Sequence, residues 1–222
     1  MHSRCTRKRI EDRLTPRQAI QLQQEWAEQV RLVPLEGGVK LIAAADAAFP
    51  RHRESCIAGV VVMTFPELEP VEEQRVEMPV VFPYIPGLLS FRECPPIIKA
   101  LDKLTSRPDV ILLDGQGYAH PRRLGLASHL GLLVNRPTIG AAKSRLIGEH
   151  LDVGPRKGDR ADLVHRDEVI GQVLRTREGV KPLYVSAGHL IDLPGAVEIV
   201  LACCRRYRLP EPARRAHHLV SG

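Results

Sequence analysis

The feature that most constrains the fold is a continuous apolar run, Val-Ile-Leu-Leu at 110–113, between Asp109 and Asp114. A run without polar alternation is typical of a strand that is buried on both faces, as parallel strands of α/β proteins are. Such a strand needs helices on both sides of its sheet. The run therefore predicts an α/β fold with segment 109–114 at its centre.

The rest of the chain supplies partners for this strand. A helix is expected from Thr15, because Thr-Pro-Arg-Gln combines an N-cap, a first-turn proline and a capping-box glutamine, and Pro34 is expected to end it. Proline-rich residues 82–96 are expected to form a loop before a short helix that carries Ile97 to Leu104. The other expected elements are strands at 39–48, 56–65, 71–80 and 137–142, helices near 124–134 and 195–206, and a hairpin of 168–178 with 183–192. The pattern predicts a mixed β-sheet flanked by helices in one domain, 1–222, with a flexible N-terminal stretch of about 14 residues.

Composition excludes several classes of protein. Hydrophobic residues make up 44% of the 222 residues, enough for a sizeable core. No apolar run approaches the roughly 20 residues of a membrane-spanning helix, and no apolar signal region follows the charged N-terminal segment. Five cysteines without C-x-x-C spacing favour a reducing compartment. We therefore expect a cytoplasmic protein without a membrane partner.

The charge suggests a polyanionic partner. The net charge is +6, and the basic surplus lies in segments 1–18 and 205–215. A basic protein of this size is a candidate for binding nucleic acid, although a merely solvated surface has the same composition. Aromatic residues are only 4% of the chain, too few for a broad platform that stacks bases.

Two carboxylates stand in apolar surroundings. Asp46 interrupts Leu-Ile-Ala-Ala-Ala-Asp-Ala-Ala, and Asp114 closes the run at 110–113. Each is consistent with a turn residue or a buried ion pair, but together they fit hard oxygen ligands for Mg²⁺ or Mn²⁺. Glu93 is a third candidate, although an acid near a helix start is also ordinary dipole compensation. Sequence spacing alone does not show that the three converge.

Other segments of the sequence also contain candidate functional residues. Lys143, in Gly-Ala-Ala-Lys-Ser, is either a cation beside a phosphate or an exposed lysine. Gly115-Gln116-Gly117 allows a close backbone approach to a ligand. In the segment Pro-Tyr-Ile-Pro at 83–86, the two prolines restrict the backbone and so hold Tyr84 and Ile85 rigidly. Such a tip either packs in the core or acts as a wedge that enters a base stack. His217, in the C-terminal segment, has the character of an idle surface group.

Three blocks of sequence resemble the endonuclease V family of deaminated-base repair nucleases. They are Pro-Tyr-Ile-Pro-Gly-Leu-Leu-Ser-Phe-Arg-Glu at 83–93, the run at 110–133 that contains Asp-Gly-Gln-Gly-Tyr-Ala-His-Pro-Arg-Arg, and Pro-Thr-Ile-Gly-Ala-Ala-Lys-Ser at 137–144. The similarity extends from roughly residue 15 to 220. The resemblance implies an RNase H-like fold, which agrees with the mixed sheet expected above.

The resemblance also implies roles for individual residues. The family's metal-binding carboxylates match Asp46, Glu93 and Asp114, and its active-site lysine matches Lys143. A further acidic or histidine position of the family falls on His217, which reverses the reading of that residue as idle. The residues implied to contact the substrate are the wedge Tyr84 with Ile85, and the pocket residues Gly87, Gly115, Gln116 and His120. The family often has histidine where this chain has Gln116, and both side chains can form hydrogen bonds.

The implied function is Mg²⁺-dependent hydrolysis, with Mn²⁺ as a substitute ion, of the second phosphodiester bond 3′ to a deoxyinosine in DNA. The protein is expected to act as a monomer. Two alternatives remain at this point: an endoribonuclease of the same fold that acts on inosine-containing RNA, and a catalytically silent nucleic-acid-binding protein.

Overall fold

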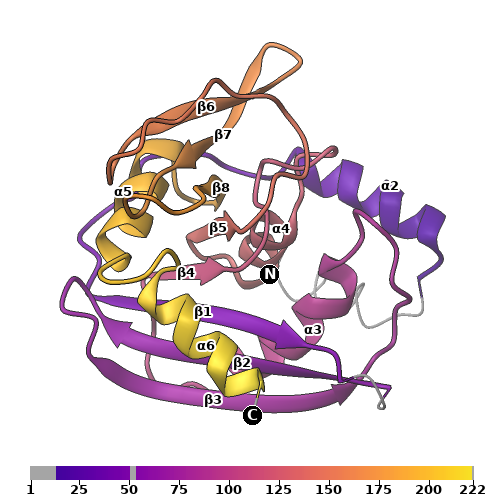
Figure 1. The fold of residues 1–222 in the computed structure, drawn as a ribbon. Coiled ribbons are helices and arrows are strands. Elements are labelled where there is room, and N and C mark those ends of the chain that lie inside the picture. The colour runs from indigo at the N-terminus through magenta and orange to yellow at the C-terminus, as the bar shows by residue number, and fades with distance from the viewer. Residues whose placement is uncertain (1–13, 51–53, 222) are drawn as a thin grey trace.

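The computed structural model describes residues 14–50 and 54–221, and their strands form one eight-stranded mixed sheet (Figure 1). The strand order is β3-β2-β1-β4-β5-β8-β7-β6. The strands are β1 (Leu41–Ala48), β2 (Ser55–Thr64), β3 (Pro70–Pro79), β4 (Val110–Leu113), β5 (Thr138–Ala142), β6 (Arg160–His165), β7 (Glu168–Leu174) and β8 (Leu183–His189). Strands β1, β4 and β5 run parallel, and the remaining pairs are antiparallel. The predicted central parallel strand is confirmed as β4.

Helices cover both faces of the sheet. Helices α2 (Pro16–Ala27), α3 (Ser90–Leu101) and α4 (Leu126–Val134) share one hydrophobic core with Ile111 and Leu113 of β4. Helices α5 (Leu193–Cys203) and α6 (Glu211–Ser221) share a second core with Val110 and Leu112. In Figure 1, α6 lies across β1 and β2. Alternate side chains of β4 thus enter opposite cores, which explains why this run has no polar residue.

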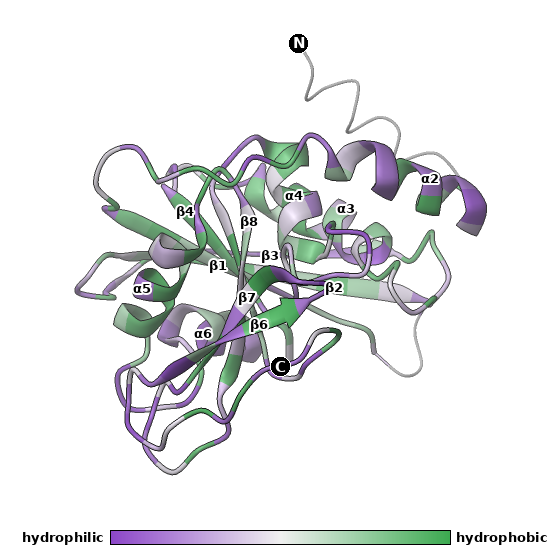
Figure 2. Cartoon of the chain, turned by 90° about the horizontal axis from the view of Figure 1, so that it is seen from above, coloured by the Kyte–Doolittle hydropathy of each residue, from purple (hydrophilic) through white to green (hydrophobic). Residues whose placement is uncertain are grey.

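The start of α2 is as predicted, but its end is not. Thr15 caps the helix, and the reciprocal capping box with Gln18 is present. Figure 2 shows hydrophobic and hydrophilic stretches side by side on this helix, as expected when one face is buried. The helix ends at Ala27, seven residues before Pro34, so the prediction of a helix through Val33 was wrong. The following segment instead joins β8, because the Arg31 carbonyl accepts a hydrogen bond from the Leu190 N–H.

Helix α3 begins earlier than predicted, at Ser90 rather than after the proline-rich segment. Glu93 therefore lies within the first turn of the helix, and Pro95 and Pro96 lie inside it. Internal prolines remove backbone hydrogen bonds at a cost of about 3 kcal/mol each. The side chains of Phe91 and Ile97 are almost fully buried in the first core, so tertiary packing overrides this local preference.

Two elements had no prediction: the edge strand β6, which is largely exposed, and helix α6, which carries His217. The predicted hairpin is confirmed as the antiparallel pair β7 and β8. Nearly all of the N-terminal stretch predicted to be flexible, residues 1–13, lies outside the described residues. Among the described residues, no helix is long and apolar enough to cross a membrane.

Candidate active site

Asp46, within β1, and Asp114, directly after β4, lie side by side on two parallel strands. The register of β1 and β4 pairs Ala45 with Leu113, so the next residue of each strand is a carboxylate. Strand alternation gives both carboxylates the same orientation as Ala44 and Leu112, toward the face covered by α5 and α6. The parallel pairing thus brings together two acids that are 68 residues apart in the sequence.

Glu93 joins these acids from α3, the helix on the opposite face. Its side chain is buried, with 9% relative exposure. Burial, together with the neighbouring charges of Asp46 and Asp114, raises the pKa of Glu93 to about 8. The three predicted metal ligands therefore interact electrostatically, and their mutual repulsion makes an added positive charge favourable at this place.

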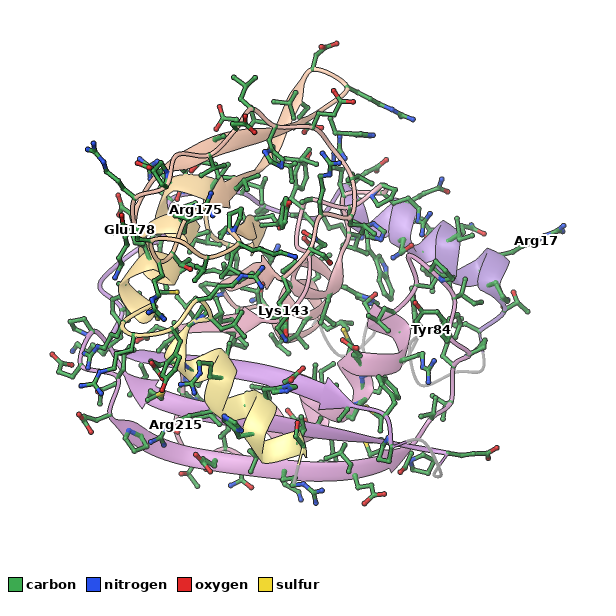
Figure 3. All side chains as sticks on the ribbon, viewed as in Figure 1. Arg17, Tyr84, Lys143, Arg175, Glu178 and Arg215 are labelled. Atoms are coloured by element: carbon green, nitrogen blue, oxygen red, sulfur yellow. The ribbon has the colours of Figure 1, made fainter. Side chains whose placement is uncertain are left out.

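Two cationic or potentially cationic side chains of the protein contact the acids. Lys143 Nζ forms an ion pair with Asp114 Oδ2. His217 Nδ1 lies 2.8 Å from Asp46 Oδ2, which joins α6 to the first strand of the sheet. Figure 3 places Lys143 near the centre of the molecule, just beyond β5. The five residues predicted to be catalytic are thus linked by these two contacts and by the electrostatic effect of Asp46 and Asp114 on Glu93.

The cluster fits a divalent cation by its donors, although it is not a preformed metal site. In the part of the chain that the structure describes, no three Asp, Glu, His or Cys side chains are arranged to hold a metal ion. The carboxylates of Asp46, Glu93 and Asp114 nevertheless supply the hard oxygen atoms that Mg²⁺ and Mn²⁺ prefer. A cation there would relieve the repulsion that raises the pKa of Glu93.

A cavity of about 420 Å³ adjoins the acidic cluster. The six residues predicted to contact the substrate all line it: Tyr84, Ile85, Gly87, Gly115, Gln116 and His120. Asp114 and Lys143 also line the cavity, whereas Asp46, Glu93 and His217 do not. The cavity and the acidic cluster therefore share one wall. Tyr84, which is labelled in Figure 3, lines the cavity and has 68% relative exposure.

Histidine 120 is neutral and has a defined tautomer. Burial, together with the nearby charge of Arg122, lowers the pKa of His120 to about 4. The backbone N–H of Arg122 donates to His120 Nδ1 over 3.2 Å, so the ring proton resides on Nε2. Gln116 is also held, because its Nε2 donates to the Ser144 carbonyl over 2.9 Å. The cavity thus presents neutral polar groups with fixed orientations.

The sequence analysis missed Arg208, which lies outside the cluster and holds its backbone. Arg208 donates to the carbonyl of Lys143 over 2.7 Å and to the carbonyl of Pro182 over 2.9 Å. It therefore fixes the backbone that carries the lysine of the candidate site. Arg208 belongs to the arginine-rich segment 205–215, and no motif distinguishes it from the other arginines of that segment.

Comparisons with known proteins agree on one family. The family model for Endonuclease V matches residues 24–218. The Endonuclease V of Gloeobacter violaceus is 52% identical over 208 residues, which cover 92% of this chain and 85% of that protein. That of Dehalococcoides mccartyi strain BAV1 is 50% identical over 204 residues, covering 92% of both chains.

Solved structures give the same result. The crystal structure of Endonuclease V from Streptomyces avermitilis has a TM-score of 0.89 and 41% identity, covering 93% of this chain and 92% of that one. The Endonuclease V of Ciona intestinalis, solved with a 23mer DNA containing an inosine followed by a ribo-adenosine, has a TM-score of 0.83 and 29% identity, covering 94% and 97%. The RNase H-like fold expected for the mixed sheet is thereby confirmed.

Proposed function

This chain belongs to the endonuclease V family of metal-dependent nucleases, and from that premise we propose that it nicks DNA beside a deoxyinosine. The bond cut is the second phosphodiester on the 3′ side of the lesion, and the cofactor is Mg²⁺, for which Mn²⁺ substitutes. DNA containing inosine is what the Ciona intestinalis relative binds in its crystal structure.

The proposal rests on one observation: the cavity and the acidic cluster have residues in common. The cavity, about 420 Å³ in volume, has room for a purine base. Asp114 and Lys143 belong both to this cavity and to the cluster that contains Asp46. A base held in the cavity therefore places its own strand against the carboxylates. The cavity that would recognise the base is thus adjacent to the carboxylates that would cut the strand. This arrangement suits cleavage of a phosphodiester bond a short distance from the lesion.

Base recognition requires that the lesion leave the duplex. An extruded base is read by hydrogen bonds in a pocket, and a side chain commonly fills the gap that it leaves. Tyr84 suits this wedge role because its ring is largely exposed beside the mouth of the cavity. The fixed orientations of His120 and Gln116 suit the reading of a neutral base such as hypoxanthine.

Hydrolysis is assigned to the acidic cluster. Asp46, Glu93 and Asp114 would hold the divalent ion, which would supply Lewis-acid stabilisation of the charge on the phosphate. Lys143 is placed to stabilise the negative charge that develops on the scissile phosphate, because its side chain is 40% exposed beside Asp114. His217 orients the Asp46 carboxylate through their 2.8 Å contact.

The test is cleavage of an end-labelled duplex that carries one deoxyinosine, with Mg²⁺ or with a chelator, beside an undamaged duplex. We expect a nick one nucleotide 3′ of the inosine, only with metal and only in the damaged strand. Asp46→Asn and Asp114→Asn should abolish the nick while binding survives, because the cavity and basic surface are retained. Asp152→Asn, at an exposed position, is the matched control.

Three results would contradict the proposal. Undiminished turnover by either variant would refute the metal assignment. Cleavage confined to a matched inosine-containing RNA would identify an endoribonuclease, and inosine-specific binding without any nick would identify a silent binding protein.

A further inference from the structure

The base of the proposed wedge is a tight turn. Leu88 N–H donates to the carbonyl of Ile85 over 2.9 Å, which closes a four-residue turn. Pro86 occupies the second position of this turn, and Gly87, with φ of +78°, occupies the third. This is the arrangement of a type II turn, in which glycine accepts the left-handed conformation without strain. Because the Tyr84 ring is largely exposed, the placement of the tip depends on what holds the turn.

Three side chains converge on the backbone of Gly87. Its carbonyl accepts hydrogen bonds from Gln23 Nε2 over 3.0 Å and from Arg122 Nη2 over 2.9 Å. The His120 ring also lies against Gly87, because its Nε2 is 3.7 Å from the place of a Cβ on this glycine. The Gly87 carbonyl has two donors, one of them a guanidinium, and is therefore held more firmly than it would be by a single neutral hydrogen bond.

Gln23 and Arg122 also hold each other. Arg122 Nε donates to Gln23 Oε1 over 2.5 Å, and Gln23 Nε2 donates to the carbonyl of Leu124 over 3.2 Å. Gln23 lies on α2 and is fully buried. The contacts thus connect α2, the turn at 85–88 and the loop at 120–124, three segments that are distant in sequence.

We propose that Gln23 and Arg122 are positioning residues for lesion recognition: they fix the Gly87 carbonyl and so set the Tyr84–Ile85 tip against the base cavity. The inference rests on the proposed function, in which this tip separates the stacked bases of a duplex. If the Tyr84–Ile85 tip is mobile, it can no longer prevent the extruded base of a duplex from returning to the base stack. The same movement matters less when the inosine lies in a single strand, which has no partner strand to re-form the pair.

Gln23 separates this role from direct DNA binding. Arg122 is partly exposed and carries a charge, so its loss would also remove a potential phosphate contact. Gln23 is neutral and has no exposed surface, so it acts on DNA only through the groups that it holds. The Gln23 variant is therefore the decisive one.

The experiment compares Gln23→Met with Gln24→Met on matched oligonucleotides, one duplex and one single-stranded, each with a single deoxyinosine. Methionine keeps the length of glutamine but offers no donor to the Gly87 carbonyl. We expect kcat/KM of Gln23→Met on the duplex to fall about tenfold, the effect of one lost hydrogen bond to a charged partner, with a clearly smaller fall on the single strand. The Gln24 side chain is exposed on the same helix, and its variant should match the wild type on both substrates.

Arg122→Met is the second variant, because its partly exposed side chain can be replaced with less risk to folding. It should change the ratio of duplex to single-strand activity in the same direction. Equal losses on the two substrates would show a merely structural role, and unchanged duplex activity would refute the inference. A wild-type protein that nicks neither oligonucleotide would instead refute the proposed function itself.

Discussion

Replacing Glu93 by glutamine is expected to stabilise the metal-free protein at neutral pH while it abolishes cleavage. Burial and the charges of Asp46 and Asp114 together raise the pKa of Glu93 from 4.5 to about 8. The neutral amide of glutamine has nearly the same shape and removes the carboxylate that the folded state disfavours. Function and stability therefore oppose each other at this residue.

The magnitude follows from proton linkage. Below pH 4.5 the carboxyl group is protonated in the folded and unfolded states alike, and its favourable contribution is complete. As the pH rises toward 8, the unfolded chain releases its proton first, and the free energy of unfolding falls by about 1.4 kcal/mol per pH unit. At pH 7 the loss is about 3 kcal/mol, which Glu93→Gln should recover as a rise in Tm of roughly 10 °C.

The assay is thermal and urea unfolding of wild type and Glu93→Gln in a chelator at pH 5 and pH 7. The two proteins should have similar stability at pH 5 and diverge at pH 7. Glu67→Gln, an exposed carboxylate, should change the free energy of unfolding by no more than about 0.5 kcal/mol. Added Mg²⁺ should stabilise the wild type more than Glu93→Gln, because binding to the folded state adds stability. A variant that is equally or less stable than the wild type at pH 7 would refute the reasoning.

Three further changes probe the wedge, the lysine and the sheet. Tyr84→Ala should change the free energy of unfolding by less than about 0.5 kcal/mol, since the ring is 68% exposed, yet slow the nicking of inosine duplexes; equal activity would argue against a wedge. Arg208→Met removes the donor that holds the Lys143 carbonyl, so single-turnover rates should fall about tenfold with KM little changed, and an unaltered rate would contradict this role. Gly140→Ala places a Cβ 2.5 Å from the Gly117 nitrogen and should destabilise the protein by about 1–3 kcal/mol, so an unchanged urea midpoint would show that the sheet yields there.

The central sheet could be predicted from sequence because its signals are local. The apolar run of β4 indicates a strand that is buried on both faces, and the capping box at Thr15 indicates the start of a helix. The positions of Asp46 within its strand and of Asp114 directly after its strand follow from the same patterns. Their convergence does not, because it depends on the register between β1 and β4.

The predictions from sequence fail where tertiary contacts outweigh the local conformational preference of the residues. Two internal prolines concealed the true start of α3, and burial of Phe91 stabilises the helix across them. Helix α6 has a weakly apolar sequence, and it gains its place by packing Ala216 and Val220 on the sheet. The contacts of Gln23 with Gly87 and Leu124 join segments 64 and 101 residues apart, and no single-sequence pattern encodes such distances.

The contact between His217 and Asp46 couples the active site to the order of synthesis. Asp46 lies on the first strand to emerge from the ribosome, whereas His217 lies on α6, after every other described element. Until α6 packs, Gly59 lacks the cover of Leu219 and Val220, and the carboxylate of Asp46 lacks its imidazole partner. A nascent chain can thus form its acidic cluster before it completes the site. Completion of the candidate site should therefore follow the packing of α6 on the sheet.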